Sequence, residues 1–141
     1  MQTLKNPLEE FMEGLRSDST RRTYKYGIRW VTPDPNAFLV NAKRSKHEAE
    51  EHVISFIKRE RERVAAATLR DPIAALKSFL DYYEVPLNWK RIKSVLPPAR
   101  KTANDRAPSR DEIRKLLSAC DLRMKGIVLI LASSGMRVGG F

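Results

Sequence analysis

The chain has 141 residues, 42% of them hydrophobic and 8% aromatic, so it can bury a core and global disorder is excluded. Its net charge of +10 and pI near 10.0 indicate a polyanionic partner, most commonly nucleic acid, with a merely solvated basic surface as the alternative. The single Cys120 excludes a disulfide framework. With no signal peptide or long apolar run in the sequence, we expect a cytoplasmic protein without a membrane segment.

Residues 7–31 are predicted to form two helices. Helical spacing of apolar residues follows Pro7, and the first helix is expected to end near residues 14–17. The second begins at residue 18 or 19 and stops before the Thr-Pro-Asp-Pro run at residues 32–35. One face of this helix is formed by Thr20, Tyr24, Ile28 and Val31. Its other faces carry four cations, Arg21, Arg22, Lys25 and Arg29.

Residues 38–45 are not assigned a helix: a short apolar patch at residues 38–40 is followed by a polar loop over residues 41–45. A long third helix is predicted from about residue 45 to residue 63. Its core stripe is Ala49, Val53, Phe56 and Ile57. The fourth helix is capped either by Thr68 or, with better local chemistry, by Asp71, which makes Pro72 its first residue.

A short basic helix over residues 89–95, capped by Asn88, is predicted to close this part of the chain. Residues 96–108 read as a linker because they include three prolines and have little to bury. The chain up to residue 95 is therefore predicted to be one bundle of four or five helices.

Two further helices are predicted after the linker. Ser109 and Glu112 have the spacing of a capping box, which opens a helix whose apolar stripe ends at Cys120, expected to be a buried thiol. A second, more apolar helix is predicted over residues 124–132. The fold class is thus all-α, with domains at residues 1–95 and 109–141 joined by the linker.

No catalytic or metal-binding constellation is recognisable in the sequence. His47 and His52 are five residues apart on a charged helix, so they do not share a face, and no cysteine or carboxylate pair completes a metal site. The glycines do not have the spacing of a phosphate-binding loop. We therefore expect no metal, no cofactor and no hydrolytic catalysis from this chain alone.

Nucleic-acid binding has more support. The second helix begins with Thr20 and free backbone N–H groups, which together suit a phosphate. Its flank carries Arg21, Arg22, Lys25 and Arg29, and the short basic helix adds Lys90, Arg91 and Lys93. An amphipathic helix whose outer side happens to be basic is the alternative.

Four passages, in order, resemble the motifs of one protein family. Residues 19–30 (STRRTYKYGIRW) are similar to an early T-x-x-x-Y-x-x-x-L helix, and residues 68–79 with residues 85–92 (VPLNWKRI) to a helix before a P-x-x-W segment. Residues 106–113 (RAPSRDEI) resemble an R-x-P-x-x-x-E-I/L opening, and residues 134–139 (SGMRVG) a (T/S)-G-x-R-(I/V)-(S/G) motif. By these passages the chain resembles the tyrosine recombinases, or phage-type integrases, including Xer-type and archaeal members.

The resemblance implies a SAM-like core-binding domain in residues 1–95, which clamps one face of a duplex, and the start of a catalytic domain in residues 109–141. Arg137 then matches the first catalytic arginine of the family. A guanidinium suits this role because it can donate two parallel N–H bonds to the non-bridging oxygens of a phosphodiester. A helix-terminal cation is the alternative. Gly140 stands where the family often has Glu, and the family's later catalytic residues, including its nucleophilic Tyr, are not in the sequence.

The first hypothesis is therefore the DNA-binding N-terminal fragment of a site-specific recombinase. It would bind double-stranded DNA without cleaving it, and its full-length parent would oligomerise on DNA. Under this hypothesis the further DNA contacts are Thr68, Arg100, Lys101 and Arg106. A stand-alone, non-enzymatic DNA-binding regulator and a helical protein-interaction domain are the alternatives.

Overall fold

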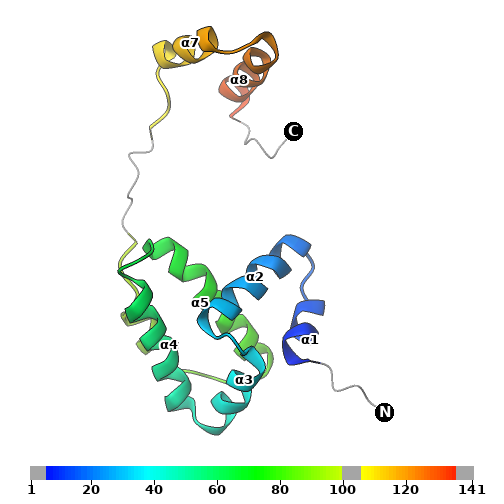
Figure 1. Ribbon diagram of the computed structural model, residues 1–141, viewed down its shortest axis with the longest axis vertical. Coiled ribbons are helices and arrows are strands. Elements are labelled where there is room, and N and C mark those ends of the chain that lie inside the picture. Colours follow the sequence, from blue (N-terminus) through cyan, green and yellow to red (C-terminus); the bar gives the residue numbers. More distant parts are fainter. Residues whose placement is uncertain (1–5, 100–105, 136–141) are drawn as a thin grey trace. The chain divides into compact units, whose positions relative to one another are not determined.

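The computed structural model describes residues 6–99 and 106–135, and all regular structure within these ranges is helical (Figure 1). The all-α prediction is thereby confirmed. The chain divides into two compact units, residues 1–100 and 101–141, and the division falls within the predicted linker. None of the helices in the described ranges is both long and apolar enough to span a membrane.

The first two helices follow the local signals of the sequence. In α1 (Pro7–Glu13) the side chain of Asn6 accepts a hydrogen bond from the N–H of Leu8 at 3.0 Å, and Pro7 occupies the first position, where its missing N–H costs nothing. The second helix, α2 (Asp18–Val31), ends before Pro33, which disfavours a helical conformation at the preceding residue.

The polar loop predicted over residues 41–45 is wrong for residues 41–44, which belong to the helix α3 (Pro35–Arg44). Asp34 caps this helix and accepts from the N–H of Ala37 at 3.1 Å. The helix forms because it buries Phe38, Leu39 and Ala42 in the core. Ser45 ends α3 and also caps α4 (Lys46–Glu60), which ends three residues earlier than predicted.

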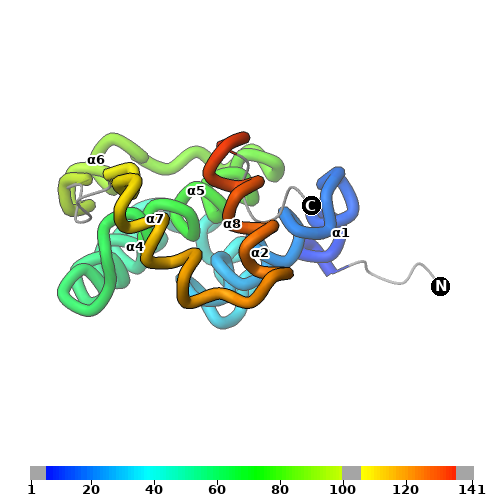
Figure 2. The backbone as a smooth tube through the Cα atoms, turned by 90° about the horizontal axis from the view of Figure 1, so that it is seen from above, coloured from blue at the N-terminus to red at the C-terminus, as the bar shows by residue number. Residues whose placement is uncertain are grey.

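The predicted start of the fourth helix is also wrong. The helix α5 (Ala66–Tyr82) has Ala65 at its N-cap, so both predicted caps, Thr68 and Asp71, lie inside the helix, and Pro72 is in its interior. This early turn is held because Leu69 is completely buried, which compensates for the hydrogen bond that Pro72 cannot donate. The predicted Asn88 cap is confirmed at the start of α6 (Trp89–Ser94), where the Asn88 side chain accepts from the N–H of Arg91 at 3.1 Å. Figure 2 labels α6.

Helices α2 and α5 pack against each other at one very close point (Figure 1). A Cβ atom placed on Gly27 would lie 3.0 Å from the Cα and 3.2 Å from the Cβ of Pro72. Glycine within a helix costs about 1 kcal/mol relative to alanine, so its presence here needs a compensating contact. That contact is the close approach to the rigid backbone of Pro72.

Replacing Gly27 with alanine is expected to destabilise the first unit by about 1–2 kcal/mol, because the overpacking penalty exceeds the gain in helix propensity. Chemical denaturation followed by circular dichroism measures this change. Gly126→Ala is the control, since Gly126 is also helical and has nothing within 4 Å of an added Cβ. A Gly27→Ala chain as stable as the wild type would refute the close approach.

The hydroxyl of Tyr83, at the C-terminal end of α5, ties this helix to α1. It lies 2.8 Å from the carbonyl oxygen of Pro7 and 3.2 Å from Oε2 of Glu10, and donates to these acceptors. Burial, and then the hydrogen bond to the Glu10 carboxylate, raises the pKa of Tyr83 to about 12. The neutral phenol is therefore favoured in the folded chain.

Tyr83→Phe is expected to lower the free energy of unfolding by about 1 kcal/mol near neutral pH through loss of these bonds. Since folding raises the pKa of Tyr83 from 10.0 to about 12, its contribution is complete below pH 10 and is lost as the pH rises towards 12. The difference in stability between the wild type and the variant should therefore shrink over this interval. Urea denaturation at several alkaline pH values tests this, and a constant difference would contradict it.

The second unit consists of α7 (Arg110–Ala119) and α8 (Leu122–Ser134). The capping box of Ser109 and Glu112 is confirmed in both directions. The predicted start of α8 at residue 124 is wrong by two residues, because Asp121 caps the helix by accepting from the N–H of Met124 at 2.8 Å.

Neither α7 nor α8 contains a buried residue. Cys120, expected to be buried, is partly exposed. The large apolar side chains exposed on these helices are Leu116, Leu122, Met124, Leu129 and Ile130.

Candidate nucleic-acid interface

The outward face of α2 combines three cations with an exposed aromatic ring. Arg22, Lys25, Tyr26 and Arg29 are spaced at i, i+3, i+4 and i+7, which places them on one side of a helix. We call these four residues the α2 stripe. Tyr26 is 75% exposed, whereas Ile28, on the inward side, is completely buried. In the part of the chain that the structure describes, the three cations have no hydrogen-bond or ion-pair partner.

Arg21 differs from its neighbour Arg22. Its Nε donates to the carbonyl oxygens of Met12 at 3.1 Å and Leu15 at 2.9 Å, and its Nη1 lies 2.9 Å from Oδ1 of Asp18. These carbonyls belong to the end of α1 and the turn that follows it. Arg21 therefore holds the α1–α2 connection in place, and its charge is already engaged.

This difference predicts unequal effects on stability for two adjacent substitutions. Arg21→Gln is expected to destabilise the first unit by about 1–2 kcal/mol, because carbonyls that accepted from a charged group lose their donor. Arg22→Gln removes the same charge but no such bond, and is expected to stay within about 0.5 kcal/mol of the wild type. Chemical denaturation of the two variants in parallel measures this, and equal stabilities would contradict the assignment.

A hollow of about 360 Å³ lies between α2 and α5, beside the α2 stripe. Its lining includes Tyr26, Thr23 and Trp30 from α2, and Thr68 and Asp71 from α5. The structure thus brings the predicted contact Thr68 next to the stripe. Thr20, the other predicted hydroxyl contact, is half-buried on the inward side of α2.

Of the predicted cations of α6, one forms ion pairs within the chain and two do not. The Arg91 guanidinium contacts the carboxylates of Glu50, at 3.2 Å, and Glu51, and so ties α6 to α4. These contacts raise the pKa of Arg91, and the Arg91 hydrogen bond lowers the pKa of Glu51. Lys90 and Lys93 are exposed, and no partner for either is found among residues 6–99 and 106–135.

In the second unit, Arg106 is engaged as well. Its Nη1 lies 2.8 Å from Oε2 of Glu112. The Arg106 bond, followed by the bond from the Ser109 backbone N–H, lowers the pKa of Glu112 to about 2. Arg106 thereby reinforces the capping box that opens α7. Two other predicted DNA contacts, Arg100 and Lys101, and the predicted catalytic position, Arg137, lie outside the described residues.

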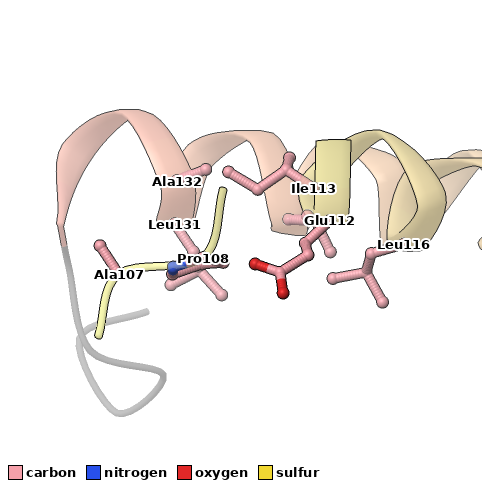
Figure 3. A pocket seen from close by; sticks show the side chains of 8 residues that line it. Ala107, Pro108, Glu112, Ile113, Leu116, Leu131 and Ala132 are labelled. Atoms are coloured by element: carbon pink, nitrogen blue, oxygen red, sulfur yellow. The ribbon is translucent and has the colours of Figure 1, made fainter. Parts of the chain in front are cut away.

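An apolar hollow of about 530 Å³ lies in the second unit, between α7, α8 and the segment that precedes α7. Figure 3 shows the carboxylate of Glu112 among the side chains of Pro108, Ile113, Leu116 and Leu131. The hollow offers apolar surface and one engaged carboxylate, so it has the character of a packing surface and not of a catalytic site.

Neither histidine is placed for metal binding. His47 and His52 are both exposed on α4, and Nε2 of His52 lies 3.0 Å from the carbonyl oxygen of Val31. Within the described residues, no three His, Cys, Asp or Glu side chains come close enough to hold a metal ion.

Tyr26 is a candidate contact that the sequence analysis missed. It lies four residues after Arg22 and three before Arg29, so the helical spacing of the cations contained the signal. We found no match to this chain among family models, curated proteins or solved structures. The functional assignment therefore depends on the residues of the chain and their geometry.

Proposed function

We propose that this chain binds double-stranded DNA through the α2 stripe. The observation that carries the proposal is the presence of three unengaged cations and an exposed tyrosine on one side of one helix. Cations that have no carboxylate partner remain available to phosphates, whereas Arg21 and Arg91 are already bound within the chain. This contrast separates a binding face from a surface that is merely basic.

The dimensions of the stripe suit a duplex backbone. With a rise of about 1.5 Å per residue, Arg22 and Arg29 are roughly 10 Å apart along the helix axis, which corresponds to about three base-pair rises of 3.4 Å along a duplex axis. Tyr26 lies between them and can donate its hydroxyl to a phosphate or pack its ring on a sugar. Thr68, in the adjacent hollow, adds a hydroxyl donor, whereas the Thr23 hydroxyl already donates to the carbonyl oxygen of Ser19 at 3.0 Å.

We further propose that the chain is the N-terminal part of a tyrosine recombinase. The motif order in the sequence supports this assignment, and so does the helical first unit followed by a separate second unit that opens with a capping box. In this proposal the first unit is the SAM-like core-binding domain, and Arg137 contributes a guanidinium to an active site that other residues complete. The chain alone binds DNA and does not cleave it.

The double variant Arg22→Gln/Arg29→Gln is expected to bind duplex DNA more weakly and with a shallower salt dependence. Each phosphate contact releases condensed counterions, so losing two contacts reduces the slope of log K against log salt concentration by about 2. Fluorescence anisotropy with a random-sequence duplex, titrated at several salt concentrations, measures both quantities.

The matched control is Arg44→Gln/Lys58→Gln. These exposed cations lie on α3 and α4 and not on α2, and their removal changes the net charge by the same amount. The control is expected to keep a slope close to that of the wild type. If both double variants lose the same slope, the binding reflects overall charge and the assignment to α2 fails.

A second candidate function, protein–protein interaction, is favoured by the exposed apolar side chains of α7 and α8. The same salt titration separates the two functions. A wild-type chain that does not bind duplex DNA even at low salt would favour a role in protein interaction.

A further inference from the structure

A second hollow, of about 330 Å³, lies between α5 and α6, which are both labelled in Figure 2. From α5 it is lined by Arg70, Ile73 and Lys77, one helical turn apart, and from α6 and its end by Trp89, Lys93 and Leu96. These α5 residues differ from those that line the hollow beside the α2 stripe. Helix α5 therefore borders two separate hollows.

The charge of this hollow is entirely positive among the described residues that line it. Arg70 and Lys93 are exposed, and neither has an ion pair or a hydrogen bond from its side chain in the described ranges. Lys77 is held by Asp81 on the next turn of α5. Two unengaged cations that face one concave surface favour an anion.

Trp89 adds an independent signal. Its indole Nε1 is fully buried and has no hydrogen-bond partner among the residues described. A buried donor without an acceptor is unfavourable, and an indole N–H can only donate. The ring lines the same hollow as Arg70 and Lys93. The hollow is thus bordered by two unengaged cations and by an indole whose N–H has no acceptor, and these groups suit an oxyanion.

We propose that the hollow between α5 and α6 binds a phosphodiester of a nucleic-acid strand. Arg70 and Lys93 neutralise the phosphate, and Nε1–H of Trp89 donates to one of its oxygens once the indole has turned about its side-chain torsions. The apolar side chains of Ile73 and Leu96 provide a surface for the adjoining sugar, which inorganic phosphate lacks. The choice of a nucleic-acid strand rests on the proposed function, whereas the anion chemistry rests on this hollow alone.

The chain contains two tryptophans, so its ¹H–¹⁵N spectrum has two indole N–H signals, and Trp30→Phe assigns both. The full chain is titrated with inorganic phosphate, with a dinucleotide that carries a single phosphodiester, and with a random-sequence duplex. We expect the dinucleotide and the duplex to shift the Trp89 signal downfield and to leave the Trp30 signal unmoved in the dinucleotide titration. A new hydrogen bond to Nε1–H causes this shift.

Arg70→Gln/Lys93→Gln is expected to abolish the Trp89 shift and to reduce the salt slope of duplex binding by about 1, the value for one phosphate contact. The control Arg44→Gln/Lys58→Gln is expected to retain the shift. Both variants change exposed side chains, and matching spectra of their remaining signals show that they are folded.

Three outcomes would overturn the proposal: no Trp89 shift with the dinucleotide, a shift with inorganic phosphate but not with the dinucleotide, or a shift that survives Arg70→Gln/Lys93→Gln. The dinucleotide is too short to need the α2 stripe. Its effect on Trp89 is therefore read separately from the effect of Arg22→Gln/Arg29→Gln on duplex binding, and either proposal can fail alone.

Discussion

The first unit depends on the close approach of α2 and α5 at Gly27 and Pro72. Without a side chain on Gly27, the two helices come near enough for Ile28, Leu69 and Leu76 to be completely buried in the core. Pro72 removes one hydrogen bond from the interior of α5 and presents a compact, rigid partner to α2 instead. Glycine and proline both have low helix propensity, but together they permit this close contact between the two helices.

The same contact positions the proposed binding surfaces. Because the inward side of α2 is fixed against α5, Arg22, Tyr26 and Arg29 are exposed, and Lys25 is partly exposed. The hollow beside the stripe takes its walls from both helices. The other hollow uses a different row of α5 residues and is completed by α6, which the Arg91 contacts tie to α4. Core packing therefore sets which cations are exposed together.

The sequence predicted the elements whose ends are decided locally. Asn88 and Ser109 cap their helices through neighbouring N–H groups, so these starts could be read directly. Two of the features that were missed depend on distant contacts. Residues 41–44 look like a polar loop but are helical because Ala42 and Leu39 are buried against the rest of the core, and α5 starts early because Leu69 is buried. Local propensity could not reveal either, since tertiary burial overrides it.

The candidate site was predictable in composition but not in detail. From their charge, Arg21 and Arg22 were both predicted to contact DNA. Only the structure distinguishes them, because the acceptors of Arg21 lie six and nine residues away, outside α2. The acceptors of Arg91 are about forty residues away. A basic chain of this kind uses some of its cations to join its own helices and leaves others unpaired. Only the unpaired cations can exchange their counterions for phosphates, so they and not the net charge determine the salt dependence of binding.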